Sequence, residues 1–380
     1  MSAINKGEIT GTVFLDLRKA FDLVNHEILL KKLSIYNLNR DAVKLFQSYL
    51  SNRRQQVYLN GHLSSQNIIK HGVPQGSILG PLLFCLFIND MPLEVSNDGN
   101  VECHLFADDS TIQSSGKEVS SVARNLQQSL NNVNKWCDQN LMSLNPTKTK
   151  AMTVTTRQQH QLGLSPLRLS LNNIDVEQVS NHRLLGITID NQLRWNAHIE
   201  KTSKALSRNV FLLSKLKHYL DVKSRKMFFF AHIKSSIDYL STVWDGASQN
   251  LLNTINSLYR RAVKMILHEA PTPTNIKFKK LEILPLQQQF TFNKSVLMHK
   301  VINNKTPKYM QTLVKRENEF HKESRTRTWK LPPTRIDLFK TSFSFSGPKT
   351  WNCLPRKIKK LTTIGPFKKN LKTFLLSETS

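Results

Sequence analysis

Acidic residues are scarce in this 380-residue chain: 27 Asp and Glu stand against 54 Lys and Arg, so the formal net charge is +27. A deficit of negative charge on this scale says little about the fold but indicates a polyanionic partner. Charge alone leaves ribosomal-type and membrane-surface proteins open. Hydrophobic residues make up 39% of the chain, which is typical of a globular protein and excludes a wholly disordered one.

Cysteine is also scarce, and the four cysteines form no CxxC pair and no spacing suited to zinc. They are Cys85, Cys103, Cys137 and Cys353. Cys85 and Cys103 lie inside apolar runs, which predicts that they are small core residues. We therefore expect free thiols in a reducing compartment rather than a disulfide framework or a zinc site.

A long apolar run is missing. A membrane-spanning helix needs roughly 18 consecutive apolar residues, whereas the run at residues 82–88 stops at Asn89 and Asp90. Residues 1–8 are polar and do not resemble a secretory signal. We therefore expect an intracellular protein, in the nucleus, the cytoplasm or both, with no membrane partner.

The hydrophobic pattern predicts alternating strands and helices in the first half of the chain. Residues 11–17 form a short apolar run suited to a buried strand, and the three- and four-residue spacing over 21–33 predicts a helix. Residues 101–106 and 111–113 are predicted to be strands, with Asp108 and Asp109 at the turn between them. A long amphipathic helix is expected over 119–140.

The second half is predicted to be mostly helical and basic from about residue 196. Pro271 and Pro273 indicate a boundary, and residues 315–335 form a polar, basic stretch of the kind found in disordered segments. A small terminal unit follows. Its expected core consists of Phe343, Phe345, Trp351, Leu354, Ile358, Phe367 and Leu371.

Three segments in the first third of the chain carry candidate chemistry. Residues 13–22 read VFLDLRKAFD, residues 72–77 read GVPQGS and residues 105–110 read LFADDS. Hard cations such as Mg²⁺ take oxygen ligands, so carboxylates from different parts of a fold must converge on them. Asp16 at a strand end and Asp108 at a hairpin turn are suited to this, with Asp109 as a supporting carboxylate. An ordinary polar hairpin turn is the alternative for Asp108 and Asp109 taken alone.

In this order, the three segments resemble the palm motifs of the reverse transcriptases of non-LTR, LINE-type retrotransposons. The resemblance implies an α+β right-hand polymerase palm, with an antiparallel sheet and helices, over residues 1–192. A helical thumb-like region over 193–270 and a basic C-terminal region over 271–380 would follow. The C-terminal half has a weaker similarity to jockey-like and chicken-repeat-like elements at residues 239–244, 259–262 and 347–355.

The implied activity is RNA-directed DNA synthesis. Such an enzyme extends the 3′-hydroxyl of a DNA primer or target DNA on an RNA template, using deoxynucleoside triphosphates. It uses two Mg²⁺ ions, for which Mn²⁺ can substitute, one activating the hydroxyl and one neutralising the leaving pyrophosphate. The resemblance makes Asp16, Asp108, Asp109 and the backbone carbonyl of Leu17 the metal ligands.

The resemblance also assigns the residues around the nucleotide. Phe21, five residues after Asp16, would lie under the incoming sugar and exclude a 2′-hydroxyl; its alternative is a first core contact of the following helix. Gly76 would permit close approach of the template base or the nucleotide, and Gln75 would hydrogen-bond near the nascent pair. Here the alternative is an ordinary Pro-Gly loop.

One lysine is a candidate acid for the pyrophosphate. The family lysine matches Lys148 best, and this residue would protonate the leaving group or stabilise its charge. A solvated surface lysine is the alternative, because Lys150 lies two residues further on.

Only fifteen residues precede Asp16, where a complete reverse transcriptase has a fingers subdomain. We therefore expect an amino-terminally truncated polymerase without fingers and without the endonuclease of complete elements. Truncation leaves a second hypothesis open, a non-catalytic basic remnant that only binds nucleic acid. An RNA-templated RNA polymerase is disfavoured, because those enzymes usually have Gly-Asp-Asp where this chain has Ala107-Asp108-Asp109, and a smaller residue at the position of Phe21.

Overall fold

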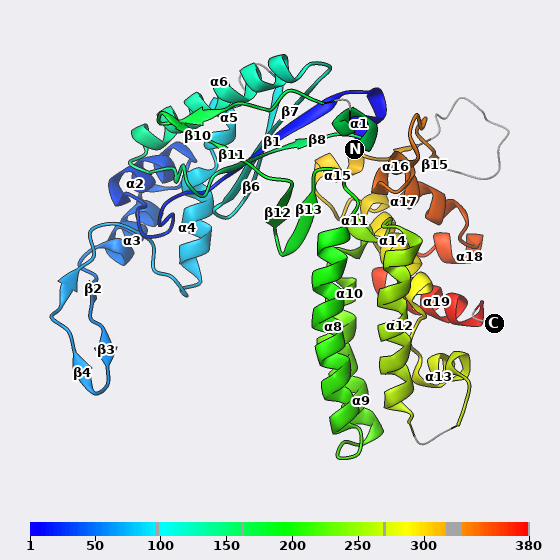
Figure 1. The fold of residues 1–380 in the computed structure, drawn as a ribbon. Coiled ribbons are helices and arrows are strands. Elements are labelled where there is room, and N and C mark those ends of the chain that lie inside the picture. Colours follow the sequence, from blue (N-terminus) through cyan, green and yellow to red (C-terminus); the bar gives the residue numbers. More distant parts are fainter. Residues whose placement is uncertain (96–98, 162, 269–270, 317–328, 379–380) are drawn as a thin grey trace. The chain divides into compact units, whose positions relative to one another are not determined.

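The computed structural model describes residues 1–95, 99–161, 163–268, 271–316 and 329–378. Contacts among these residues divide the chain into two compact units (Figure 1). We call Gly7–Leu185 the sheet unit. The helical unit combines Met1–Lys6 with the chain from Gly186 onward. The predicted α+β class is confirmed, whereas the subdomain limits at residues 192 and 270 stay a prediction.

A five-stranded sheet organises the sheet unit, with strand order β11-β8-β1-β7-β6. The central strand β1 (Ile9–Leu15) is buried along almost its whole length and pairs antiparallel with both β7 (Asp109–Gly116) and β8 (Lys150–Val154). β6 (Val101–Phe106) pairs antiparallel with β7, while β11 (Glu177–Gln178) runs parallel to β8. The sheet is therefore mixed, and its three central strands follow the predicted antiparallel pattern.

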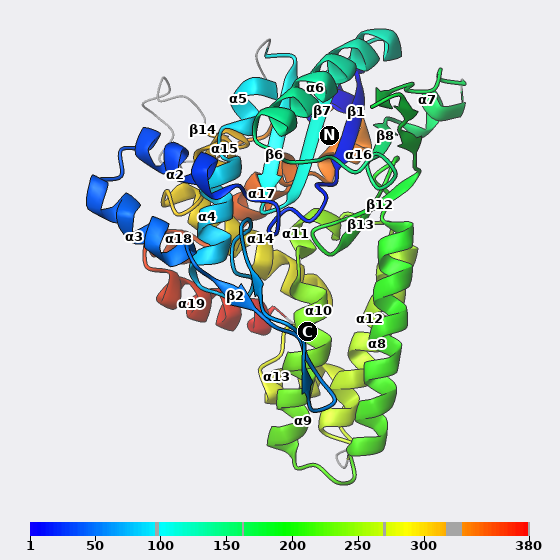
Figure 2. The ribbon, with the colours of Figure 1, turned by 90° about the vertical axis from the view of Figure 1, so that its left-hand side faces the viewer.

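Helices pack on this sheet through apolar stripes. The long helix α6 (Val119–Gln139) contacts β1 and β7 and lies across them in Figure 2. Its buried residues recur at helical spacing, among them Val122, Leu126, Leu130 and Val133. Helices α2 (His26–Ile35), α3 (Arg40–Leu50), α4 (Leu79–Ile88) and α5 (Met91–Val95) complete the helical part of the core.

The remaining elements of the sheet unit are short. Two pairs of short strands form a protruding ribbon, in which β2 pairs with β5 and β3 with β4 (Figure 1). The short strands and the last helix are β2 (Arg54–Gln55), β3 (Tyr58–Leu59), β4 (His62–Leu63), β5 (Asn67–Ile68), α7 (Arg157–Gln161), β9 (Ser170–Leu171), β10 (Ile174–Asp175) and β12 (Asn181–Leu184).

Two predicted elements differ from the observed ones in a way that matters for the site. Helix α2 begins at His26 rather than near residue 21, because Asn25 caps it by accepting a hydrogen bond from the Ile28 N–H at 3.0 Å. The prediction of Asp109 at the hairpin turn was wrong. Asp109 pairs with Phe106 as the first residue of β7, so the turn consists of Ala107 and Asp108.

One buried charge ties α2 to the rest of the core. The Lys32 ammonium donates to the Phe87 carbonyl at 2.8 Å and to the Asp90 carboxylate at 2.7 Å. It also lies 4.7 and 4.8 Å from the ring centroids of Phe87 and Trp136. The Trp136 indole N–H donates to the same carboxylate oxygen at 3.1 Å. Burial lowers the pKa of Lys32, and Asp90 opposes that effect.

Replacing Asp90 by Ala is expected to destabilise the sheet unit, because it leaves the buried Lys32 ammonium without its counter-charge. Asp90 is partly exposed, so the loss should lie between the ~1 kcal/mol of a surface pair and the roughly 3–5 kcal/mol of a buried one. Urea unfolding measures it. In the double variant Lys32→Met/Asp90→Ala the loss should shrink, and a purely additive loss would contradict the pairing.

The helical unit contains two hydrophobic clusters. Helices α8 and α12 pack together in the first, and α14 contacts α17 and α19 in the second. The elements are α1 (Ser2–Lys6), β13 (Ile187–Asp190), α8 (Asn196–Leu216), α9 (Val222–Phe228), the π-helix η1 (Phe229–Lys234), α10 (Ser235–Asp238), α11 (Ser241–Trp244), α12 (Gln249–Ile266), α13 (Thr274–Leu281), α14 (Leu286–Ile302), α15 (Lys308–Thr312), β14 (Lys315–Arg316), β15 (Trp329–Lys330), α16 (Asp337–Lys340), α17 (Phe343–Asn352), α18 (Arg356–Lys359) and α19 (Ile364–Ser377).

The start of α8 is held by one carboxylate. Asp190 accepts hydrogen bonds from the backbone N–H groups of Gln192, Arg194 and Trp195, the last at 2.6 Å. Trp195 adopts a left-handed backbone (φ +69°) just before the helix. The carboxylate therefore satisfies donors that would otherwise have no partner at the turn into a long helix.

The predicted terminal core is largely confirmed. Trp351, Leu354, Ile358, Phe367 and Leu371 are buried in the second cluster. The side chain of Phe343 packs against it partly buried, and Phe345 lies outside it. Residues 317–328 of the polar stretch fall outside the described part of the chain.

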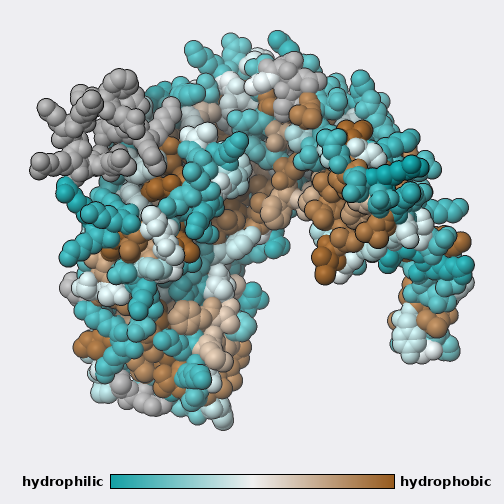
Figure 3. Space-filling model, turned by 180° about the vertical axis from the view of Figure 1, so that it is seen from behind, coloured by the Kyte–Doolittle hydropathy of each residue, from teal (hydrophilic) through white to brown (hydrophobic). Residues whose placement is uncertain are grey.

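Some apolar side chains are exposed although the apolar sequence around them predicts burial. Helix α4 is apolar all round, yet Ile78 before it is 95% exposed and Leu82 is 52% exposed. Cys85 is exposed on the same helix, so its prediction as a core residue was wrong, while Cys137 is buried and Cys103 half-buried. Hydrophobic surface of this kind is visible in Figure 3. Among the described residues, none of the helices has the length and apolarity for a membrane span.

Candidate active site

The carboxylate of Asp16 follows directly on the last residue of β1. Its backbone is held on both sides: the Asp16 carbonyl accepts from the Asn145 N–H at 2.8 Å, and its N–H donates to the Thr149 hydroxyl at 3.4 Å. The next turn is fixed as well, because the Arg18 N–H donates to the Ser143 carbonyl at 2.8 Å. The carboxylate is therefore attached to a rigid strand end.

Asp108 lies at the turn of the hairpin β6–β7, beside the end of β1 that carries Asp16. Because β1 and β7 pair antiparallel with Leu15 opposite Ser110, the turn before β7 lies beside the end of β1. Ala107 has a left-handed backbone (φ +52°), which costs an L-residue roughly 1–2 kcal/mol. The tight turn places the Asp108 side chain at the end of β1 rather than along the strand.

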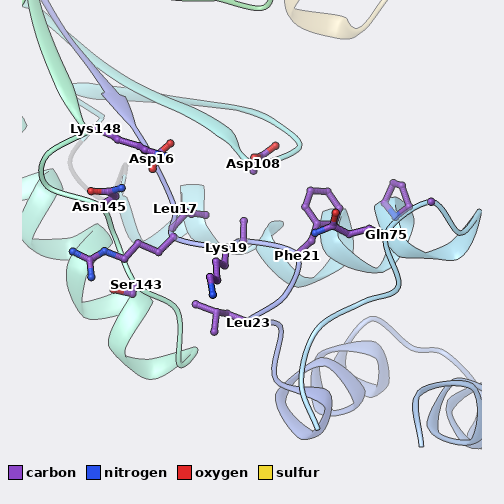
Figure 4. A pocket seen from close by; sticks show the side chains of 14 residues that line it. Asp16, Leu17, Lys19, Phe21, Leu23, Gln75, Asp108, Ser143, Asn145 and Lys148 are labelled. Atoms are coloured by element: carbon purple, nitrogen blue, oxygen red, sulfur yellow. The ribbon is translucent and has the colours of Figure 1, made fainter. Parts of the chain in front are cut away.

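A cavity of about 900 Å³ opens at this end of the sheet. Seven of the eight predicted site residues line it, namely Asp16, Leu17, Phe21, Gln75, Gly76, Asp108 and Lys148. Figure 4 shows Lys148 next to Asp16, Asp108 across from them, and Gln75 beside Phe21. The eighth residue, Asp109, does not belong to this lining and is exposed at the start of β7.

Asp109 lies near enough to Asp16 and Asp108 for their charges to affect it. Burial raises the pKa of Asp109, and the carboxylates of Asp108 and Asp16 raise it further. A cation near these carboxylates would favour the ionised form of Asp109. His182 opposes this effect on the pKa of Asp109, while burial lowers the pKa of His182 itself.

His182 was missed by sequence reasoning. Its ring stacks on Phe14 of β1 with a centroid distance of 3.8 Å and an interplanar angle of 11°. No local pattern signals this position, since His182 lies in a short polar strand far along the chain from Phe14 and Asp109. Only the packing of the sheet unit brings them together.

The oxygen donors at the cavity fit a hard divalent cation. Mg²⁺ usually keeps several waters and is held by one or two carboxylates together with substrate phosphates. Asp16, Leu17 and Asp108 line the cavity, where the two carboxylates and the Leu17 backbone carbonyl would be the oxygen donors. Within the described ranges, no group of three or more His, Cys, Asp or Glu side chains forms a complete cage for a metal ion. The donor set therefore suits a metal that substrate phosphates help to bind.

Phe21 lines the cavity and also packs on the core. Its ring stacks on Phe84 of α4 at a centroid distance of 4.5 Å and an angle of 25°. The two roles predicted as alternatives are thus geometrically compatible. Gly76 has a left-handed backbone (φ +79°), with open space where a Cβ would lie.

The two candidate lysines have different surroundings. Lys148 lines the cavity. Lys150, at the start of β8, donates to the Thr147 carbonyl at 2.7 Å and to the Glu177 carboxylate at 2.6 Å. The ion pair of Lys150 with Glu177 therefore links β8 to β11. Lys148 instead faces the space where a substrate would bind.

The comparisons with known proteins agree with this geometry. Residues 2–189 match the family model described as reverse transcriptase (RNA-dependent DNA polymerase). The probable RNA-directed DNA polymerase from transposon BS of Drosophila melanogaster is 28% identical over 276 residues, which covers 70% of this chain and 30% of that protein. The RNA-directed DNA polymerase from mobile element jockey of the same species is 27% identical over 281 residues, 70% of this chain and 29% of the relative.

The chain thus spans about 30% of the length of the curated relatives it matches. Among solved structures, telomerase from Candida tropicalis in complex with a fragment of telomeric RNA aligns with 72% of this chain and 49% of its own, at 12% identity and a TM-score of 0.36. Residues 2–189 therefore match the reverse transcriptase family model, and 70% of the chain is similar to RNA-directed DNA polymerases of non-LTR retrotransposons.

Proposed function

We propose that the sheet unit is the palm of an RNA-directed DNA polymerase. It would extend the 3′-hydroxyl of a DNA primer on an RNA template with deoxynucleoside triphosphates. The observation that carries this proposal is the cavity at the end of β1. Asp16, Gln75 and Asp108 come from three separate segments and line it together.

Each residue would have a distinct task in the reaction. Asp16, Asp108 and the Leu17 carbonyl would hold two Mg²⁺ ions, which supply activation of the primer hydroxyl and neutralisation of the leaving pyrophosphate. Asp109 would support them from the start of β7. Lys148 would donate a proton to the pyrophosphate or balance its charge.

Primer extension tests this proposal. The full chain is incubated with an RNA template, a 5′-labelled DNA primer, deoxynucleoside triphosphates and Mg²⁺. A matched primer that ends in a dideoxynucleotide is the control. We expect elongation of the first primer alone and its loss with EDTA. Elongation of neither primer, with duplex binding intact, would favour the non-catalytic remnant instead.

Phe21 is expected to exclude ribonucleotides. Replacing it by Val removes the ring beside the incoming sugar, so incorporation of a ribonucleotide relative to the matching deoxynucleotide should rise about 10–10²-fold, the range of small steric differences in a pocket. Phe21→Tyr keeps the ring and serves as the control. If Phe21→Val only lowers stability through the lost contact with Phe84 and leaves the sugar preference unchanged, Phe21 is a core residue alone.

The helical unit would supply phosphate contacts. Residues 338–377 contain eight Lys and one Arg but no Asp or Glu, and most of these cations are exposed on or near α18 and α19. Such contacts give affinity without reading sequence.

Duplex binding should therefore weaken steeply with salt, with a log–log slope of roughly −0.7 to −0.9 per phosphate contact. Fluorescence anisotropy between low and moderate salt measures it. Reversing Lys368 and Lys369 to Glu should reduce the slope, and an unchanged slope would remove α19 from the interface.

A further inference from the structure

The loop after β1 and the loop before α4 are joined along their backbones. The Val73 N–H donates to the Phe21 carbonyl at 2.8 Å, and the Gly72 N–H donates to the Val24 carbonyl at 2.8 Å. A further β-bridge joins Asn25 to His71. Backbone hydrogen bonds therefore connect Phe21 to the segment that leads to Gln75.

The approach of the two loops is too close for a side chain. Gly72 has a left-handed backbone (φ +89°), and a Cβ there would lie 2.8 Å from the Asp22 carbonyl oxygen and 2.9 Å from the Asp22 Cα. Because both of these are backbone atoms, the clash could not be relieved by a rotamer change. Glycine is thus required at position 72 for the junction to form.

Two side chains complete the junction. His26, the first residue of α2, has its Nε2 2.7 Å from the Gly72 carbonyl. A carbonyl only accepts hydrogen bonds, so this nitrogen carries the proton. Asp22 accepts a hydrogen bond from the Gln75 side-chain amide at 2.9 Å.

The bond between Asp22 and Gln75 fixes which way the amide faces. A carboxylate only accepts hydrogen bonds, so the Gln75 NH₂ group must be the end that faces Asp22. The amide oxygen is then directed away from Asp22. Since Gln75 lines the cavity, a defined acceptor is presented beside Phe21.

We infer that Asp22 and His26 are positioning residues that hold Gln75 against Phe21, so that the Gln75 amide oxygen accepts a hydrogen bond from the incoming nucleotide. This inference rests on the proposed polymerase function. Asp22 acts on Gln75 directly, and His26 acts through the Gly72 carbonyl. Neither residue is expected to touch the metal ions or the reacting phosphate.

Primer extension at varied nucleotide concentration tests the inference through the split between KM and kcat. Asp22 is exposed, so its bond competes with water, and Asp22→Ala should raise the KM for the deoxynucleotide about three- to tenfold with little change in kcat. Asp22→Asn keeps an acceptor and should stay near the parent. Glu27→Ala, which removes an exposed carboxylate from α2 next to His26, is the control.

A double-mutant cycle makes the test specific. Asp22→Ala should have no further effect on KM in a Gln75→Ala background, because its partner is already gone. His26→Ala should raise KM in the same sense as Asp22→Ala. Fully additive effects of Asp22→Ala and Gln75→Ala, or an unchanged KM in Asp22→Ala, would overturn the inference.

A second readout does not depend on catalysis. In protein labelled with ¹⁵N-glutamine, the Gln75 side-chain amide signal is assigned by its loss in Gln75→Met. It should shift in Asp22→Ala and stay in place in Glu27→Ala, and an unmoved signal in Asp22→Ala would refute the contact. If the parent chain extends no primer, the polymerase function fails, while this signal still decides whether Asp22 orients Gln75.

Discussion

Replacing Asp108 by Ala is expected to lower the rate of primer extension about 10²–10⁴-fold. The carboxylate would hold a metal whose charge stabilises the transition state by several kcal/mol, and each ~1.4 kcal/mol corresponds to a tenfold change in rate. Binding of the primer–template should stay within about twofold, because phosphate contacts come from basic residues. Rapid-quench extension and anisotropy measure the two quantities on one preparation.

The loss should not result from unfolding. Burial and the neighbouring carboxylates raise the pKa of Asp109, so removing Asp108 relieves repulsion in the metal-free chain. The melting temperature of Asp108→Ala is therefore expected to be no lower than that of the parent chain. Asp175→Ala, which removes an exposed carboxylate on β10, is the matched control and should keep full activity. Extension by Asp108→Ala at the parent's rate would remove Asp108 from the metal site.

Replacing Lys148 by Met is expected to slow the chemical step about 10²–10⁴-fold, the usual contribution of a general acid. The methionine keeps the length of the side chain and removes both the proton and the charge. Affinity for the primer–template should change little. Single-turnover incorporation of one nucleotide measures the chemical step without product release.

Lys150 provides the control for Lys148. It lies two residues further on and pairs with Glu177 instead of lining the cavity. Lys150→Met should therefore lower stability slightly and leave the rate of incorporation within a few-fold of the parent. Equal losses in both variants would show that general positive charge acts here, and a loss confined to Lys150→Met would reverse the assignment.

The places of Asp16 and Asp108 in the fold could be predicted from the sequence because they follow a strand end and a turn, whereas their role as metal ligands stays a prediction. Asp16 comes after an apolar run, and Asp108 lies at a turn between two strands. The antiparallel pairing of β1 and β7 then brings both to one end of the sheet. Gln75 belongs to a segment rich in Pro and Gly, and this composition predicts a loop.

Other features depend on register and packing, which local pattern does not determine. Asp109 lies in β7 rather than in the turn because its pairing with Phe106 extends the hairpin up to Ala107 and Asp108. His182 reaches Asp109 only through its stacking on Phe14. Cys85 is exposed because part of the apolar surface of α4 is uncovered, which its uniformly apolar sequence could not indicate.

The central claim is that Asp16, Leu17 and Asp108 hold metal ions at one place. Cleavage of the protein backbone by an iron ion bound at that place would test this claim most directly. Fe²⁺ replaces Mg²⁺ in the presence of a deoxynucleoside triphosphate, and ascorbate with peroxide generates hydroxyl radicals that cut the nearby backbone. We predict cuts close to residues 16 and 108, suppressed by excess Mg²⁺ and absent in Asp108→Ala. Cuts elsewhere, or the same cuts in Asp108→Ala, would contradict the account.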